Sequence, residues 1–183
     1  MELIKKIDLI KYTKIISLVL LGSLLLTISA KIKIPFYPVP MTMQTFVVLF
    51  LGIALGPKIG LATVSLYLLE GIFGFPVFAN SPEKGIGLIY FTGPTMGYLI
   101  GFLVATFLAG LFTFKENLFL NFCKIILSVS SIYILGVLWL GMLIGWDKPI
   151  LKLGAYPFLL AELFKMGIIT LLAKKITKLR KII

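Results

Sequence analysis

The chain has 183 residues, of which 60% are apolar, and its formal net charge is +11. Soluble domains contain roughly 45–50% apolar residues, so the composition argues against a water-soluble globular fold. The charged residues stand in short clusters between long uncharged stretches, which is typical of a protein that crosses a membrane several times. We therefore predict an all-α integral membrane protein that forms a single domain over residues 1–183.

Several function classes are excluded by the residues that are missing. The basic residues are not interleaved with aromatic residues on one face, so we expect no nucleic acid as a partner. The chain has no histidine, and Cys123 is its one cysteine, so His-ligated and Cys-cluster metal sites and an internal disulfide are excluded. No Walker A motif is present. We expect no cofactor and no enzymatic activity, and any energy for uphill transport must come from a partner or an ion gradient.

Six apolar runs follow one another along the chain. A helix needs about 20 residues to span a bilayer, so the second and third runs are short. Gly56 and Pro57 lie between them and favour a tight turn. We predict six transmembrane helices, at residues 12–30, 41–55, 59–75, 92–114, 118–145 and 155–173.

The distribution of basic residues predicts the orientation. Six spans place both termini on the same side of the membrane. If that side is the inside, then more than half of the 18 basic residues lie in inner segments, including five between Lys174 and Lys181. The positive-inside rule therefore predicts a multi-pass membrane protein with both termini in the cytoplasm.

Small residues recur at every fourth position of the fourth run. This spacing places them on one helix face, where the backbone of another helix can approach closely. The pattern favours helix packing over a ligand-binding role. The residues are Gly93, Gly97, Gly101, Ala105 and Ala109.

Polar residues inside the apolar runs need an explanation, because ionisable groups in a membrane usually line a cavity or form a pair. Glu162 and Lys165 are three positions apart in the sixth run and share a helix face. They form either a neutralising pair or a polar binding surface. Glu70 lies near the outer end of the third run, where it can reach the interface. Gln44 lies one turn into the second run, and its amide needs either a neighbouring helix or a ligand.

The longest irregular segment covers residues 76–91 on the predicted outer side. Long ordered loops are often functional lids, so this segment is a candidate gate. Asn80 lies near its start, where an asparagine is most often a turn residue. Tyr90 lies near its end, where it belongs either to an aromatic belt or to the wall of a pocket.

Four short segments together resemble a known family. They are Pro38–Thr45, Gly74–Asn80, Thr92–Tyr98 and Pro157–Lys165. In this order and spacing they are similar to the BioY family, the biotin-binding S components of energy-coupling-factor (ECF) transporters. The resemblance implies six helices in the lipid bilayer of a bacterial cytoplasmic membrane, cytoplasmic termini and a biotin pocket toward the outer side. It also implies a coupling transmembrane protein and two ATPase subunits as partners.

The resemblance also implies a binding site. Biotin has two ureido N–H donors, a ureido carbonyl and a tail carboxylate, and charge-assisted hydrogen bonds would hold them most strongly. Asn80, Glu162 and Lys165 fall at the family's polar ligand contacts, and Phe78 would support the apolar ring. Gln44 and Tyr90 complete the candidate set. The group that binds the tail carboxylate stays unassigned, with Lys84 as one candidate.

The chain departs from the family pattern at two positions. Ala161-Glu162 stands where the family usually has Gly-Asp, so the carboxylate is kept but carried on a longer side chain. Met96 stands where a second glycine is common. The alternatives to biotin uptake are an S component or standalone carrier for another small vitamin, a membrane enzyme, and a purely structural bundle. The lack of histidine and of a carboxylate cluster argues against the enzyme.

Overall fold

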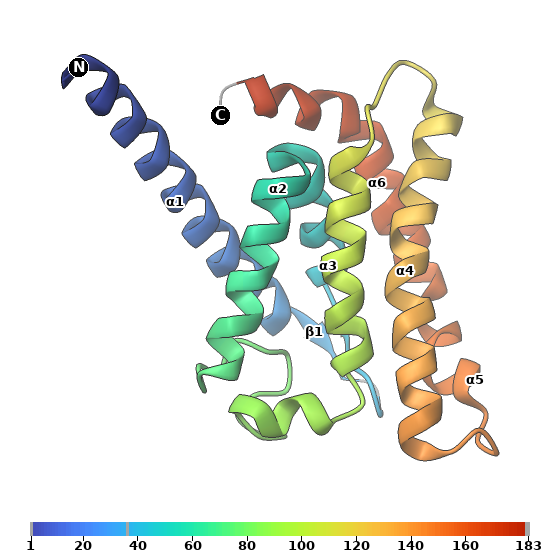
Figure 1. The fold of residues 1–183 in the computed structure, drawn as a ribbon. Coiled ribbons are helices and arrows are strands. Elements are labelled where there is room, and N and C mark those ends of the chain that lie inside the picture. Colours follow the sequence, from blue (N-terminus) through green and yellow to red (C-terminus); the bar gives the residue numbers. More distant parts are fainter. Residues whose placement is uncertain (1, 36, 182–183) are drawn as a thin grey trace.

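The computed structural model of the chain describes residues 2–35 and 37–181, with side chains from residue 9 onward apart from residue 36. The long helices pack side by side in one bundle (Figure 1). The described residues form α1 (Glu2–Lys31), α2 (Gln44–Ile72), α3 (Met96–Leu111), α4 (Leu118–Ile144), α5 (Ile150–Gly154) and α6 (Leu159–Thr177). Short 3₁₀ helices are η1 (Gly87–Thr92), η2 (Tyr156–Phe158) and η3 (Lys178–Lys181). The all-α membrane fold predicted from the sequence is confirmed.

Helix α2 is two helices joined by a reversal of the chain. Gly56 breaks the helix with a φ of 77° and a ψ of 177°, a backbone conformation that glycine adopts without steric cost. After the break the chain doubles back (Figure 1), and Gly60 lies against Gly52. The halves, 44–55 and 57–72, correspond to the predicted second and third spans. Counting both halves, six long helical segments run along the described part of the bundle.

Arg180 completes the end of the first half of α2. Pro57 has no N–H to donate to the Ile53 carbonyl, so the end of this half-helix leaves that oxygen without its helical partner. The Arg180 guanidinium donates to this oxygen at 2.7 Å and to the Gly52 carbonyl at 3.3 Å. The C-terminal segment is thereby held against the helix reversal.

Other helix bounds differ from the apolar runs in ways that hydropathy does not encode. Helix α1 begins before the predicted run 12–30, through a segment that carries charges. Helix α3 is shorter than the predicted 92–114, because Thr92 ends η1 and Gly93 has an extended backbone. Helix α4 ends at Ile144, just short of the predicted 145, and α6 covers Leu159–Thr177 in place of 155–173.

The row of small residues packs α3 against its neighbours. A Cβ atom added at Gly97 or Gly101 would collide with the backbone of α4, at Leu135 and Ile132 respectively. Ala105 and Ala109 are fully buried on the same face. The backbones therefore approach closely, as small residues permit in membrane helices.

The outer surface of the bundle suits lipid. In the described residues, four segments are long and apolar enough to cross a membrane, and α3 is a shorter apolar helix of 16 residues. At 1.5 Å per residue, α3 is about 24 Å long. Large apolar side chains are exposed on several helices, among them Leu21, Leu160, Phe164 and Leu171.

The two ends of the bundle differ. One end carries the short antiparallel strands β1 (Lys33–Ile34) and β2 (Met41–Thr42), the segment 73–95 with η1, and α5 (Figure 1). The other end carries the α2 reversal, the loop 112–117 and η3 (Figure 1). The two strands were not predicted, since each is only two residues long. They place residues 39–42 beside the helices that form the pocket described next.

Candidate functional site

A small internal pocket lies at the end of the bundle that carries the strands. Its walls come from the segment 39–45, from α3, α4 and α6, and from the segment 73–95. They include Thr42, Thr45, Ala79, Tyr90, Tyr133 and Glu162. Segments far apart in the sequence thus meet around one space, and most of its surface is apolar apart from a few polar groups. Such a lining is typical of a small-molecule site.

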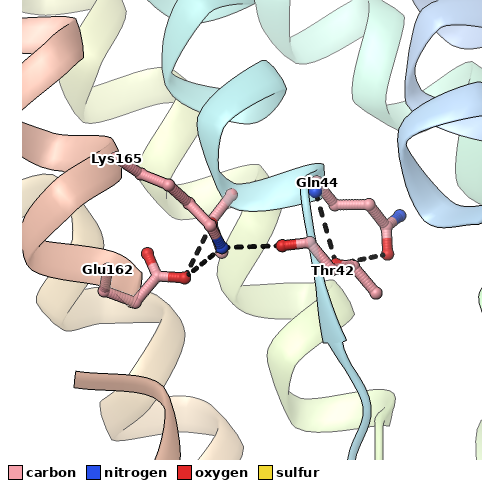
Figure 2. A network of polar contacts seen from close by, with 5 residues as sticks. Thr42, Gln44, Glu162 and Lys165 are labelled. Carbon is pink, nitrogen blue, oxygen red and sulfur yellow. Dashed lines mark hydrogen bonds and ion pairs between the residues drawn. The ribbon is translucent and has the colours of Figure 1, made fainter. Parts of the chain in front are cut away.

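Glu162 and Lys165 form a buried ion pair on one side of this pocket. The Lys165 Nζ lies 2.7 Å from the Glu162 Oε1, and the two side chains are 7% and 4% exposed (Figure 2). The Thr45 hydroxyl donates to the same Oε1 at 2.8 Å. Burial of such a pair costs desolvation energy and is tolerated only when further hydrogen bonds satisfy it.

The three donors of the Lys165 ammonium are all used within the protein. Besides Glu162, it donates to the backbone oxygen of Thr42 at 2.6 Å and to the Thr45 hydroxyl at 3.0 Å. An ammonium has three N–H groups and no acceptor. Lys165 therefore fixes the carboxylate of Glu162 and joins α6 to the residues before α2.

The second carboxylate oxygen of Glu162 is different. Among the described residues, Oε2 of Glu162 is the one buried side-chain nitrogen or oxygen without a hydrogen-bond partner. A buried unsatisfied polar group costs about 1–3 kcal/mol, and more when it is charged. Glu162 also lines the pocket. The site therefore offers a buried carboxylate oxygen without a hydrogen-bond partner to a ligand with N–H groups.

Gln44 lines the pocket beside this pair, with its amide hydrogen-bonded to the protein. Its Nε2 donates to the Tyr67 hydroxyl at 2.7 Å. Its Oε1 accepts from the Thr42 hydroxyl at 3.3 Å (Figure 2). Tyr67 in turn donates to the Val77 carbonyl at 3.2 Å. Gln44 therefore connects the start of α2 to the segment that follows its second half.

The remaining candidates lie on the loop side. Tyr90 lines the pocket, and its ring stacks on Phe78 with centroids 4.6 Å apart. Phe78 is 1% exposed and packs behind Tyr90 and against Tyr67, so it supports the wall. Asn80 donates its backbone N–H to the Tyr90 hydroxyl at 3.3 Å. Burial raises the pKa of Tyr90 above its ordinary value of 10.0, so its hydroxyl is neutral at physiological pH.

Several polar members of the site were not predicted from the sequence. Thr45 bridges Glu162 and Lys165, and Thr42 accepts from Lys165, although both residues lie within the quoted motif Pro38–Thr45. Tyr98 and Tyr133 lie in the pocket wall on α3 and α4. The sequence signal that could have identified them is a tyrosine hydroxyl within an otherwise apolar helix. Glu70, by contrast, accepts from Ser23 at 2.9 Å and connects α2 to α1 away from the pocket.

The fold and this pocket together define a multi-pass helical membrane protein with a small-molecule site near one end of the bundle. Comparison with known protein families then identifies the family within this class. The profile of the BioY family matches residues 4–182, and the chain belongs to the BioY family.

Individual relatives agree with this assignment. The chain is 34% identical to "Probable biotin transporter BioY" of Pyrococcus horikoshii, over 89% of this chain and 96% of the relative. It is 36% identical to "Biotin transporter BioY" of Thermotoga maritima, over 85% of this chain and 90% of the relative. A crystal structure of the S-component for biotin from an ECF-type ABC transporter superposes with a TM-score of 0.76 and 25% identity, covering 92% of this chain and 93% of that one.

Proposed function

We propose that this chain captures biotin at the pocket between α3, α4, α6 and the segment 73–95, and delivers it for uptake as the S component of an ECF-type transporter. Relatives named as biotin transporters and a solved biotin S-component support the substrate and the transporter class. The expected partners are the coupling transmembrane protein and the two ATPase subunits of such a transporter, together with the lipid bilayer.

The free Oε2 of Glu162 is the observation that carries the proposal. Biotin's ureido ring presents N–H donors, and Glu162 presents a buried carboxylate oxygen without a hydrogen-bond partner among the described residues, with the Tyr133 hydroxyl nearby. A hydrogen bond from a ureido N–H to this oxygen would be charge-assisted, and such bonds are about twice as strong as neutral ones. Lys165 and Thr45 hold the other oxygen, so the acceptor is oriented before the ligand arrives.

The loop side of the pocket supplies the apolar wall in this proposal. Tyr90 offers its ring, and Phe78 fixes the ring from behind. The cavity measures about 50 Å³, whereas small-molecule pockets typically have roughly 300–1,000 Å³. Biotin entry therefore requires the walls to separate. The segment 73–95 is the wall best suited to move, since it is largely irregular.

The proposed orientation places both termini in the cytoplasm. The start of α1 and the end of η3 lie at the same end of the bundle (Figure 1). Five of the 18 basic residues lie between Lys174 and Lys181 at that end. The positive-inside rule then supports a pocket that faces the outer side of the membrane, where biotin is captured.

Equilibrium binding of biotin to the purified chain in detergent tests the proposal. The decisive variant is Glu162→Gln, which keeps the shape but removes the charge. We expect its affinity to fall at least tenfold, about 1.4 kcal/mol. Glu116→Gln is the matched control, because the Glu116 side chain is 83% exposed and lies at the other end of the bundle.

Two outcomes would contradict parts of the proposal. Tight binding that survives Glu162→Gln would keep the substrate and reject the role of Oε2. No binding of biotin by a well-folded parent protein would reject the substrate. A screen of other small vitamins would then test the alternative function, an S component or carrier for another vitamin.

A further inference from the structure

Two lysines at the end of α1 and in β1 reach the same loop beside the pocket. The Lys31 Nζ donates to the backbone oxygens of Phe78 and Ser81, at 2.8 and 2.9 Å. The Lys33 Nζ donates to the Ala79 backbone oxygen at 2.5 Å and to the Asn80 Oδ1 at 3.3 Å. Two ammonium groups therefore converge on residues 78–81.

These two charges are only partly compensated. Their hydrogen-bond acceptors are neutral carbonyl and amide oxygens, and the ion pairs found in residues 9–35 and 37–181 involve other lysines. Glu83 interacts with Lys31 at longer range, without forming a salt bridge. Each ammonium donates two hydrogen bonds to these acceptors out of a possible three. Each lysine therefore has one N–H left for a further acceptor, and an anion would satisfy both charges best.

The position of Lys33 relates this charge to the pocket. Lys33 pairs with Thr42 in the β1–β2 register, and Thr42 lines the pocket. Its acceptor Ala79 also lines the pocket, and its acceptor Asn80 is bonded to the pocket residue Tyr90. Lys33 thus borders the loop side of the pocket, whereas Glu162 lies on the α6 side.

We propose that Lys33, supported by Lys31, binds the carboxylate at the tail of the ligand while Glu162 holds the ureido ring. This inference rests on the proposed function. A carboxylate is an acceptor-only group, and its hydrogen bonds to an ammonium are charge-assisted. The site would therefore recognise a molecule with N–H donors at one end and an acid at the other.

The structure favours Lys33 over Lys84 for this role. The Lys84 Nζ lies over the ring of Tyr37, 5.2 Å from its centroid. Neither its hydrogen bonds nor the pocket lining connects Lys84 to Glu162. Lys33 lies just outside the pocket lining and touches it at two segments, at Ala79 through a hydrogen bond and at Thr42 through strand pairing.

Comparison of biotin with biotinamide, whose tail is uncharged, tests the proposal by equilibrium binding. Lys33→Gln removes the charge but keeps N–H donors for the loop, and Lys152→Gln on α5 is the control. The parent should prefer biotin by at least about tenfold. Lys33→Gln should reduce this preference to less than about threefold, through weaker biotin binding alone. Lys152→Gln should leave both affinities unchanged.

Three results separate the possible failures. Equal weakening of both ligands by Lys33→Gln would mean that Lys33 only anchors the loop, and would overturn the inference. A folded parent that binds both ligands equally would overturn it without any variant, so the test stands even if Lys33→Gln does not fold. A folded parent that binds neither ligand would instead reject the proposed function.

Discussion

Helix α6 carries an ion pair near each end, and the two pairs lie in opposite environments. Glu162 and Lys165 are almost fully buried, while Lys174 and its partner Glu116 are 47% and 83% exposed. The exposed pair keeps its hydration and is screened by salt, so it contributes little to stability. The buried pair has lost its water, and each charge depends on the few groups around it.

A glutamate and a lysine therefore have different roles at the two ends of α6. At the exposed end, either residue can move away without leaving a buried charge. At the buried end, Thr42 and Thr45 are needed to complete the hydrogen bonds, and one oxygen of Glu162 is still left over. The buried pair is therefore expected to serve ligand binding more than stability, and the following four predictions test this contrast.

Lys165→Met should have the largest effect on stability. It leaves the Glu162 carboxylate buried without its cation, and loss of one partner of a buried pair costs about 3–5 kcal/mol. The free energy of unfolding by SDS in mixed micelles measures the change. A loss below 1 kcal/mol would show that the pair is more hydrated than its burial indicates.

Replacement of both Glu162 and Lys165 by leucine should separate stability from binding. Apolar replacement of a whole buried pair is often neutral, or stabilising by about 1–4 kcal/mol. We expect the free energy of unfolding of the double variant to be at least as high as that of the parent. We expect the double variant to bind no biotin. The same unfolding and binding assays apply. A strongly destabilised double variant would show that the buried pair serves stability and not only ligand binding.

Arg180→Met should give an intermediate effect at the exposed end. Arg180 lies near Lys174 in sequence, but it donates to the carbonyls of Gly52 and Ile53, and Pro57 leaves the Ile53 carbonyl without its helical partner. Hydrogen bonds from charged groups contribute about 1.5–3 kcal/mol. A matching loss of unfolding free energy, with unchanged biotin affinity, is the expected result. Arg180→Lys is the control for charge, and unchanged stability of Arg180→Met would show that water replaces the guanidinium.

Lys174→Met should have the smallest effect. Exposed ion pairs contribute about 0–1 kcal/mol, so both the unfolding free energy and the biotin affinity should stay close to those of the parent. The variant also serves as the matched control for Lys165→Met. A loss as large as that of Lys165→Met would remove the distinction between the two ends of α6.

Much of the architecture could be predicted from the sequence, because lipid imposes a simple rule on it. Long apolar runs become helices, so the membrane bundle was predictable, and Gly56-Pro57 marked the reversal between the short second and third spans. The row from Gly97 to Ala109 also marked a packing face, because a four-residue spacing stays on one side of a helix.

The site was predictable only in part. Glu162 and Lys165 were expected on one face, because they are three residues apart, and both lie in the buried network. Phe78 was expected to support the ligand directly, whereas it lies behind Tyr90. The role of Thr45 depends on contacts with residues more than a hundred positions away.

The sequence by itself determined that this protein lies in a lipid bilayer, how many helical segments it has and which helix face carries the ion pair. Those properties follow from local composition and from the period of the helix. The tertiary structure alone decided that Thr42 and Thr45 satisfy Lys165, that one oxygen of Glu162 is left without a partner, and that Lys33 reaches the loop beside Tyr90. The physical reason is that these contacts depend on how helices rotate and tilt against one another, and hydropathy records only which residues avoid water.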